Sequence, residues 1–230
     1  MTERRVYVDY NATTPLKSDV KATLINDLDV FGNASSMHTS GRLARAKVEE
    51  ARESVASLLG SPSSSIIFTS GGSESNNAVF QTMRNLAFDK NEFIITAIEH
   101  PCVLKAAEYT KNQGFKVTEI PVDEYGKLNM DAYRAALNDK TLFVSVMMAN
   151  NEIGVLQDIK QITNLAKQVG AFVHTDAVQA VGKIPVNAES LGVDYLTMSA
   201  HKIYGPKGVC ALYVKKGAPL YPLIHGGHQE

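Results

Sequence analysis

The run Leu142-Phe-Val-Ser-Val-Met147 decides the fold that we expect for this chain. It is apolar at almost every position instead of every second one, which is typical of a strand that helices cover on both faces of its sheet. Short apolar runs recur along the sequence, and we expect strands at Ser65–Thr69, Glu92–Ala97, Phe115–Val122, Thr141–Met148, Ala171–Thr175, Val193–Ser199 and Val209–Val214. A sheet of such strands needs helices on both sides.

Stretches with helical periodicity lie between these runs. The clearest has apolar residues at helical spacing from Ala44 to Leu58 and ends at Gly60, where a left-handed cap belongs. We expect further helices at Ser18–Val30, Glu74–Ala87, Cys102–Gln113, Met130–Asn138 and Asp158–Val169. Because the two kinds of element alternate without a repeat or linker, the sequence predicts an α/β fold with a mostly parallel, doubly wound sheet and helices on both faces. The direction of the last strands stays open.

The composition excludes several classes of protein. Of 230 residues, 44% are hydrophobic and 20% are charged, as in ordinary globular proteins. A formal net charge of -1 without a basic run gives no reason to expect nucleic acid as a partner. No apolar stretch is long enough to span a membrane, and the first residues lack the apolar core of a signal peptide. With only Cys102 and Cys210, we expect no disulfide framework and a cytoplasmic protein.

Polar clusters follow five of the expected strands, and ligands of open α/β sheets bind at the carboxyl ends of strands. We therefore expect these clusters to meet in one site. They are Ser70-Gly-Gly-Ser-Glu-Ser75, Glu99-His-Pro101, Asn150-Asn-Glu152, His174-Thr-Asp176 with Gln179, and Ser199-Ala-His-Lys202.

Three of the groups match the needs of pyridoxal phosphate, which are a lysine for its aldehyde, an anion for its ring nitrogen and a cradle for its phosphate. Lys202 is a candidate for the first, although a lysine is more often solvated. Asp176 is a candidate for the second, although it could cap a helix instead. The Gly72–Ser73 turn opens a helix whose N–H groups could hold a phosphate, with an ordinary Ser73 cap as the alternative. As a set they predict this cofactor.

Two histidine motifs have different interpretations. His100 precedes Pro101 at an expected helix start, so it could cap that helix, or stack on a cofactor ring and relay protons. His225 and His228 form an H-x-x-H pair without nearby cysteine or carboxylate ligands, and we expect no metal site. The Walker pattern and G-x-G-x-x-G are absent from the sequence, which argues against a nucleotide cofactor.

The motifs together resemble the cysteine desulfurases of the class V aminotransferase group, within the fold-type I pyridoxal-phosphate enzymes and closest to their iron–sulfur-assembly and nitrogen-fixation branch. The segments that carry the resemblance are Tyr7-Val-Asp-Tyr-Asn-Ala-Thr-Thr-Pro15, Phe31-Gly-Asn-Ala-Ser-Ser36, Phe68-Thr-Ser-Gly-Gly-Ser-Glu-Ser75, Glu99-His100, Asn150-Asn-Glu-Ile-Gly154, His174-Thr-Asp-Ala-Val-Gln179 and Ser199-Ala-His-Lys-Ile-Tyr-Gly-Pro-Lys-Gly208. Ala200 stands where many of these relatives carry glycine.

This resemblance implies a role for each site residue. Lys202 would bond to the cofactor and move a substrate proton, and His100 would stack on the ring and assist. Asp176 would pair with the ring nitrogen, and Asn151 would contact cofactor or substrate. The remaining implied contacts are the phosphate with Gly72, Ser73, Ser199 and His201, and the ring oxygen with Gln179.

The resemblance also implies an activity, in which a homodimer converts L-cysteine to L-alanine and passes the sulfur through an enzyme persulfide to an iron–sulfur scaffold or another acceptor protein. Residues 1–230 would be the cofactor-binding large domain with its N-terminal arm. By the same resemblance, we expect the smaller C-terminal domain, with the sulfur-accepting cysteine, to be absent from residues 1–230, and neither Cys102 nor Cys210 matches that cysteine. The alternatives are a cofactor-binding fragment or split-enzyme subunit without desulfurase activity of its own, and another class V lyase or transaminase.

Overall fold

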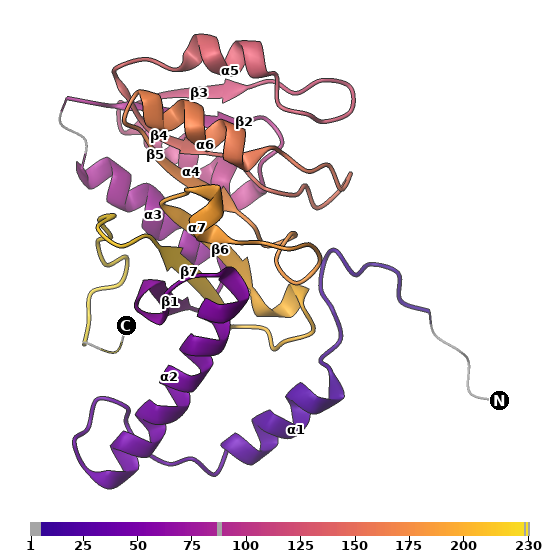
Figure 1. Cartoon of the computed structure of the whole chain (residues 1–230), viewed down its shortest axis with the longest axis vertical. Helices are drawn as coiled ribbons and strands as arrows, with labels where there is room; N and C mark the ends of the chain where they lie inside the picture. The colour runs from indigo at the N-terminus through magenta and orange to yellow at the C-terminus, as the bar shows by residue number, and fades with distance from the viewer. Residues whose placement is uncertain (1–5, 87–88, 228, 230) are drawn as a thin grey trace.

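The computed structural model describes residues 6–86, 89–227 and 229. Within them, seven strands form one sheet in the order β1-β7-β6-β5-β4-β2-β3 (Figure 1). Their bounds are β1 Ile66–Thr69, β2 Glu92–Thr96, β3 Lys116–Ile120, β4 Thr141–Ser145, β5 Phe172–Asp176, β6 Tyr195–Ser199 and β7 Cys210–Val214. The expected strands are therefore present, although some end two or three residues earlier than the apolar runs do.

The sheet is parallel from β6 through β5, β4 and β2 to β3, whereas β7 is antiparallel to both of its neighbours, β6 and β1. The reason lies in the connection after β6, because the segment from Ala200 to Val209 is too short for the helical crossover that a parallel neighbour requires. The predicted mostly parallel, doubly wound sheet is confirmed, and the direction of its last strand is settled.

The helices are α1 Ser18–Asp27, α2 Thr39–Leu59, α3 Gly72–Leu86, α4 Pro101–Asn112, α5 Met130–Ala136, α6 Ile159–Gln168 and α7 Ala188–Leu191, with 3-10 turns at Ser63–Ser65 and Ala200–Lys202. Gly60 ends α2 in the left-handed conformation, with φ 60°, as its position predicted. The expected helix end at Ala87 lies outside the described residues. Helix α7 was not expected, because four residues are too few to show a helical period.

Two hydrophobic cores lie on opposite faces of the sheet. The side chains of β2 alternate between them, so that Phe93 and Ile95 pack toward α3 and α4 while Ile94 packs toward the other core. That second core is covered by α5, α6, α7 and the end of α2 (Figure 1). Because both faces are covered, we expect a ligand of this sheet to bind at the ends of the strands.

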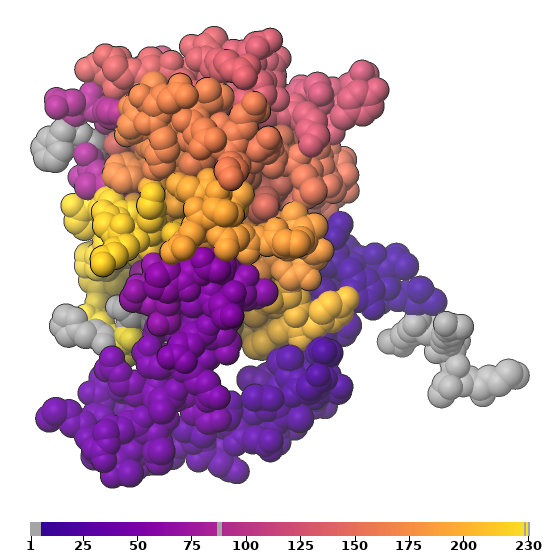
Figure 2. All heavy atoms as spheres, in the orientation of Figure 1, coloured from indigo at the N-terminus to yellow at the C-terminus, as the bar shows by residue number. Residues whose placement is uncertain are grey.

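Helix α1 and the first part of α2 project away from the sheet (Figures 1 and 2). Helix α1 contains no buried residue, and Leu28 and Phe31 after it are 82% and 88% exposed. Among the helices described, none is long and apolar enough to cross a membrane.

Candidate functional site

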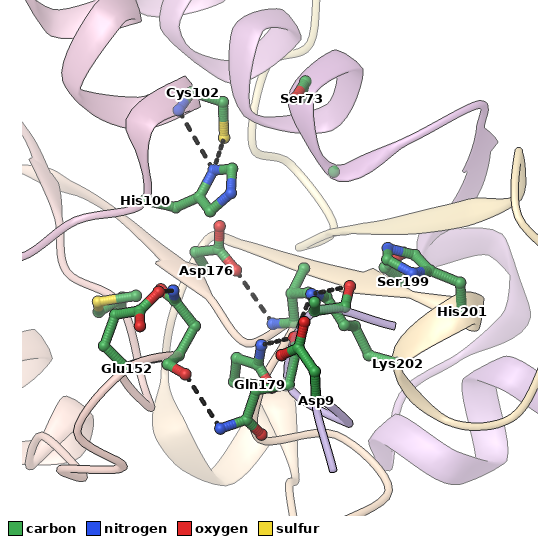
Figure 3. Close-up of a pocket in the computed structure, with 16 residues that line it drawn as sticks. Asp9, Ser73, His100, Cys102, Glu152, Asp176, Gln179, Ser199, His201 and Lys202 are labelled. Atoms are coloured by element: carbon green, nitrogen blue, oxygen red, sulfur yellow. Dashed lines mark hydrogen bonds between the residues drawn. The ribbon is translucent and has the colours of Figure 1, made fainter. Parts of the chain in front are cut away.

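A cavity of about 650 Å³ lies at the carboxyl ends of the parallel strands (Figure 3). All nine residues predicted for cofactor binding line it, because each ends or follows a strand that points toward the same edge of the sheet. They are Gly72, Ser73, His100, Asn151, Asp176, Gln179, Ser199, His201 and Lys202. The structure thus brings the predicted set together, while the role of each residue stays a prediction.

Asp176 ends β5 and is 6% exposed. Its Oδ1 accepts a hydrogen bond from the main-chain N–H of Val178 at 3.0 Å, and its Oδ2 accepts one from Nδ2 of Asn76 at 2.9 Å. Burial raises the pKa of Asp176, whereas these two bonds and the charges of His100 and Lys202 lower it. The result is a buried, oriented carboxyl group suited to a cationic or N–H partner in the cavity.

Lys202 lies in the 3-10 turn after β6 and is half-buried. Its Nζ donates hydrogen bonds to the main-chain carbonyls of Asn11 and, at 2.8 Å, Ala12. Burial and the charge of Lys183 lower the pKa of Lys202, while Asp176 is one of two carboxylates that raise it. A lowered pKa increases the share of neutral amine, which is the form that attacks an aldehyde.

The turn from β1 to α3 presents Gly72 and Ser73 to the cavity. The carboxylate of Glu74 accepts a hydrogen bond from the main-chain N–H of Ser70 at 2.8 Å. Glu74 thus holds the turn that precedes α3. Ser73 is the second residue of α3, so it does not occupy the N-cap position before the helix; its carbonyl accepts from Nδ2 of Asn77 at 2.8 Å. The start of α3 therefore presents backbone N–H groups and a hydroxyl to an anion.

His100 caps α4, since its Nδ1 accepts from the main-chain N–H of Cys102 at 3.2 Å. The thiol of Cys102 lies 3.0 Å from the same nitrogen. Figure 3 shows the other ring nitrogen on the side away from Cys102. The capping interpretation is thus confirmed, and it leaves the far edge of the ring available to the cavity.

The N-terminal arm is part of the site, which the sequence did not reveal. Nδ2 of Asn11 donates to the carbonyl of Asn151 at 3.0 Å, and Nε2 of Gln179 donates to the carbonyl of Asn11 at 2.8 Å. Farther along, the N–H of Thr14 donates to the carbonyl of His201 at 2.9 Å. Residues after three strands thus bind the arm, which the sequence indicated only as an extended segment and a turn.

The cavity suits pyridoxal phosphate by its chemistry and its size. An amine, a buried carboxyl group, and a helix start with hydroxyl and imidazole donors all line it, and its volume lies within the range of small-molecule sites, about 300 to 1,000 Å³. In the part of the chain that the structure describes, no group of three or more potential His, Cys, Asp or Glu metal ligands occurs. His228 of the H-x-x-H pair lies outside that part.

Comparison with known proteins places this site in a family. The sequence model of the class-V aminotransferases matches residues 6–230, and the chain therefore belongs to that family, whose members depend on pyridoxal phosphate.

Within the family, the predicted resemblance to cysteine desulfurases of the IscS and NifS type is confirmed. Cysteine desulfurase IscS of Dictyoglomus turgidum is 48% identical to this chain, over 99% of the chain and 58% of the relative. A cysteine desulfurase of Sinorhizobium fredii is 46% identical over 99% and 59%, respectively. The chain thus spans less than two thirds of the length of these curated relatives.

Solved structures agree. A NifS-like protein superposes with a TM-score of 0.96 at 42% identity, over 98% of this chain and 63% of that one. A structure described as SspA in complex with cysteine gives a TM-score of 0.92 at 36% identity, over 98% and 66%.

Proposed function

We propose that this chain binds pyridoxal phosphate and forms the cofactor-binding large domain of a cysteine desulfurase. The observation that carries the proposal is that Lys202, Asp176 and the Gly72–Ser73 turn, from three separate strand ends, line one cavity. When bound, the cofactor supplies an electron sink for breaking bonds at the substrate α-carbon. The chain's own residues would hold it and move protons around it.

Each residue has a task that its position supports. Nζ of Lys202 would bond to the cofactor aldehyde and afterwards carry a proton to or from the substrate. The carboxylate of Asp176 would accept the N–H of the cofactor ring. His100 would stack on the ring and assist the proton transfer, with Nε2 on the side away from Cys102. Asn151 and Gln179 would orient substrate and ring oxygen.

Phosphate would bind where α3 begins and where β6 ends. Gly72 and Ser73 present N–H groups and a hydroxyl, and Ser199 and His201 reach the same cavity. Nδ1 of His201 lies 3.0 Å from Oγ1 of Thr13, so the arm would hold this imidazole in place.

L-cysteine is the proposed substrate, with L-alanine as the product and the sulfur passed through a persulfide to an iron–sulfur scaffold or another acceptor. The relative described as bound to cysteine supports this choice. Cys210 is buried in β7, and burial raises the pKa of Cys102, which disfavours its thiolate. We therefore propose that the sulfur-accepting thiol lies outside residues 1–230. A homodimer that covers the exposed apolar residues of α1, in the cytoplasm, completes the proposal.

The test is to mix the purified chain with pyridoxal phosphate and record the absorption band of a lysine-bound cofactor. Wild type should show the band, and after borohydride reduction the added mass should lie on Lys202. Lys202→Ala should lose the band, because no other lysine lines the described cavity. Lys183→Ala is the matched control and should keep it, since Nζ of Lys183 also bonds Asn11 but lies outside the cavity lining.

A band that persists in Lys202→Ala would refute the assignment of this lysine. Adding L-cysteine to the loaded chain should change the spectrum without release of sulfide. Sulfide release by this chain alone would refute the proposal that the sulfur-accepting thiol lies outside residues 1–230. A loaded chain that L-cysteine leaves unchanged would favour a cofactor-binding subunit or another class V lyase or transaminase.

A further inference from the structure

Asn76 lies fully buried behind the cavity, at 0% exposure in α3, and no pattern in the sequence singles it out. Its Nδ2 donates to Oδ2 of Asp176 at 2.9 Å and to Sγ of Cys102 at 3.2 Å. An amide group has two N–H bonds, so these two contacts use its whole donor capacity.

The chemistry of the neighbours fixes which way this amide points. If it were turned over, its Oδ1 would face the Asp176 carboxylate, and two acceptors would meet. In the orientation observed, Oδ1 is buried and has no hydrogen-bond partner among the described residues. An unpaired buried acceptor costs free energy, which indicates that the placement of the two donors outweighs it.

We propose that Asn76 is a positioning residue, which holds the Asp176 carboxylate toward the cofactor ring nitrogen and links it through Cys102 to His100. The inference rests on the proposed function, since it gives Asn76 its purpose there. Cys102, which accepts a hydrogen bond from Asn76, in turn donates its main-chain N–H to Nδ1 of His100. The thiol of Cys102 lies at the same nitrogen. The neutral ring therefore carries its proton on Nε2, away from Cys102.

Asn76 also opposes the effect of burial on Asp176. Burial raises the pKa of this carboxyl group, and the Asn76 bond is the first of the contacts that lower it. A ring nitrogen that shares a proton needs an anionic partner, so a donor that favours the anion supports cofactor binding even though it never touches the cofactor.

The experiment titrates Asp176 by carboxyl ¹³C NMR in the cofactor-free protein. Asn76→Ala removes both donors and should lower the ionisation constant of Asp176 by about tenfold or more. Asn76→Asp keeps the volume but places an acidic acceptor beside Asp176, and should act in the same direction, so the result does not depend on the alanine variant folding. Asn77→Ala is the matched control, because Nδ2 of Asn77 bonds the carbonyl of Ser73 and does not contact Asp176.

Cofactor affinity is the second measurement. Asn76→Ala should weaken it by about 10- to 100-fold while the lysine adduct still forms. An Asp176 titration that is the same in wild type, Asn76→Ala and Asn76→Asp would overturn the inference. A wild-type chain that fails to bind the cofactor would instead overturn the proposed function, and the titration would still decide whether Asn76 holds Asp176.

Discussion

Relative to wild type, Glu99→Gln should gain folding stability as the pH rises from 5 to 8. Glu99 is 4% exposed, and its Oε1 accepts from Oγ1 of Thr96 at 2.6 Å and from the N–H of Met147 at 2.7 Å. Its Oε2 is buried without a hydrogen-bond partner among the described residues. Burial raises the pKa of Glu99 from 4.5 to about 8. A glutamine keeps the acceptor that these donors need and cannot ionise.

The sign follows from proton binding. Between pH 4.5 and about 8, the folded protein keeps the proton on Glu99 while the unfolded chain releases it. The folded state binds more protons in this range, so the contribution of Glu99 to stability is complete below pH 4.5 and is lost as the pH rises through the folded pKa. The loss is about 1.4 kcal/mol for each pH unit, or about 4 kcal/mol between pH 5 and pH 8.

The assay compares free energies of unfolding in urea for wild type and Glu99→Gln at pH 5, 6, 7 and 8. The difference between the two proteins should change by the amount above, whatever its value at pH 5. Glu108→Gln is the control, because its hydrogen bond and charge pairing with Lys105 lower the pKa of that exposed carboxylate, and its contribution is lost only below pH 4.5. A Glu99→Gln difference that stays constant across the range would mean that Glu99 is ionised in the folded state, and the reasoning would be refuted.

Two further substitutions test the sheet and a helix end. Burial lowers the pKa of His174 to about 3, so its contribution to stability is present above pH 6.5 and is lost below it. We compare the free energies of unfolding in urea of wild type and His174→Gln. From pH 6.5 to pH 5, wild type should lose about 2 kcal/mol relative to the variant. If the two free energies changed in parallel with pH, the imidazole of His174 would not be neutral and buried. In Gly60→Ala, the new Cβ would lie 2.1 Å from Nδ2 of Asn187, at φ 60°. We expect a loss of about 2 kcal/mol by thermal or urea unfolding, against about 1 kcal/mol for Gly114→Ala, which is also left-handed but faces open space; equal losses would rule out the contact with Asn187.

The fold could be predicted because its strands are buried on both faces. A run such as Leu142-Phe-Val-Ser-Val-Met147 is stable only in a strand that is buried on both faces of its sheet. The alternation of such strands with helices then limits the possible topologies. Strand ends were predicted less well, since Met148 is as apolar as Val144 although β4 ends at Ser145. The polarity of the side chains does not indicate where the hydrogen bonds between neighbouring strands end.

The residues that line the cavity at the strand ends could be predicted from the sequence, whereas the residues that hold them in place could not. Lys202 and Asp176 stand next to strand ends, so the topology alone brings them to one edge. Asn76 and Asn77 are adjacent and chemically identical in the sequence, and only the packing of α3 decides that Asn76 faces Asp176. Asn11 is still farther from its partners in sequence, and its contacts depend on the path of an arm that no periodicity describes.

Two buried carboxyl groups, Asp176 in the cavity wall and Glu99 outside it, differ in the hydrogen bonds that their oxygens accept. Burial raises the pKa of both carboxyl groups, and the charge of Asp176 raises the pKa of Glu99 further. Asp176 has donors on both oxygens and the charge of Lys202 nearby, whereas Glu99 has donors on one oxygen only. Unequal surroundings of this kind separate two pKa values and assign the roles. Asp176, which lines the cavity, is therefore the better placed of the two to pair with a ring nitrogen. Glu99 instead accepts the N–H of Met147, just after β4, and is not part of the cavity lining.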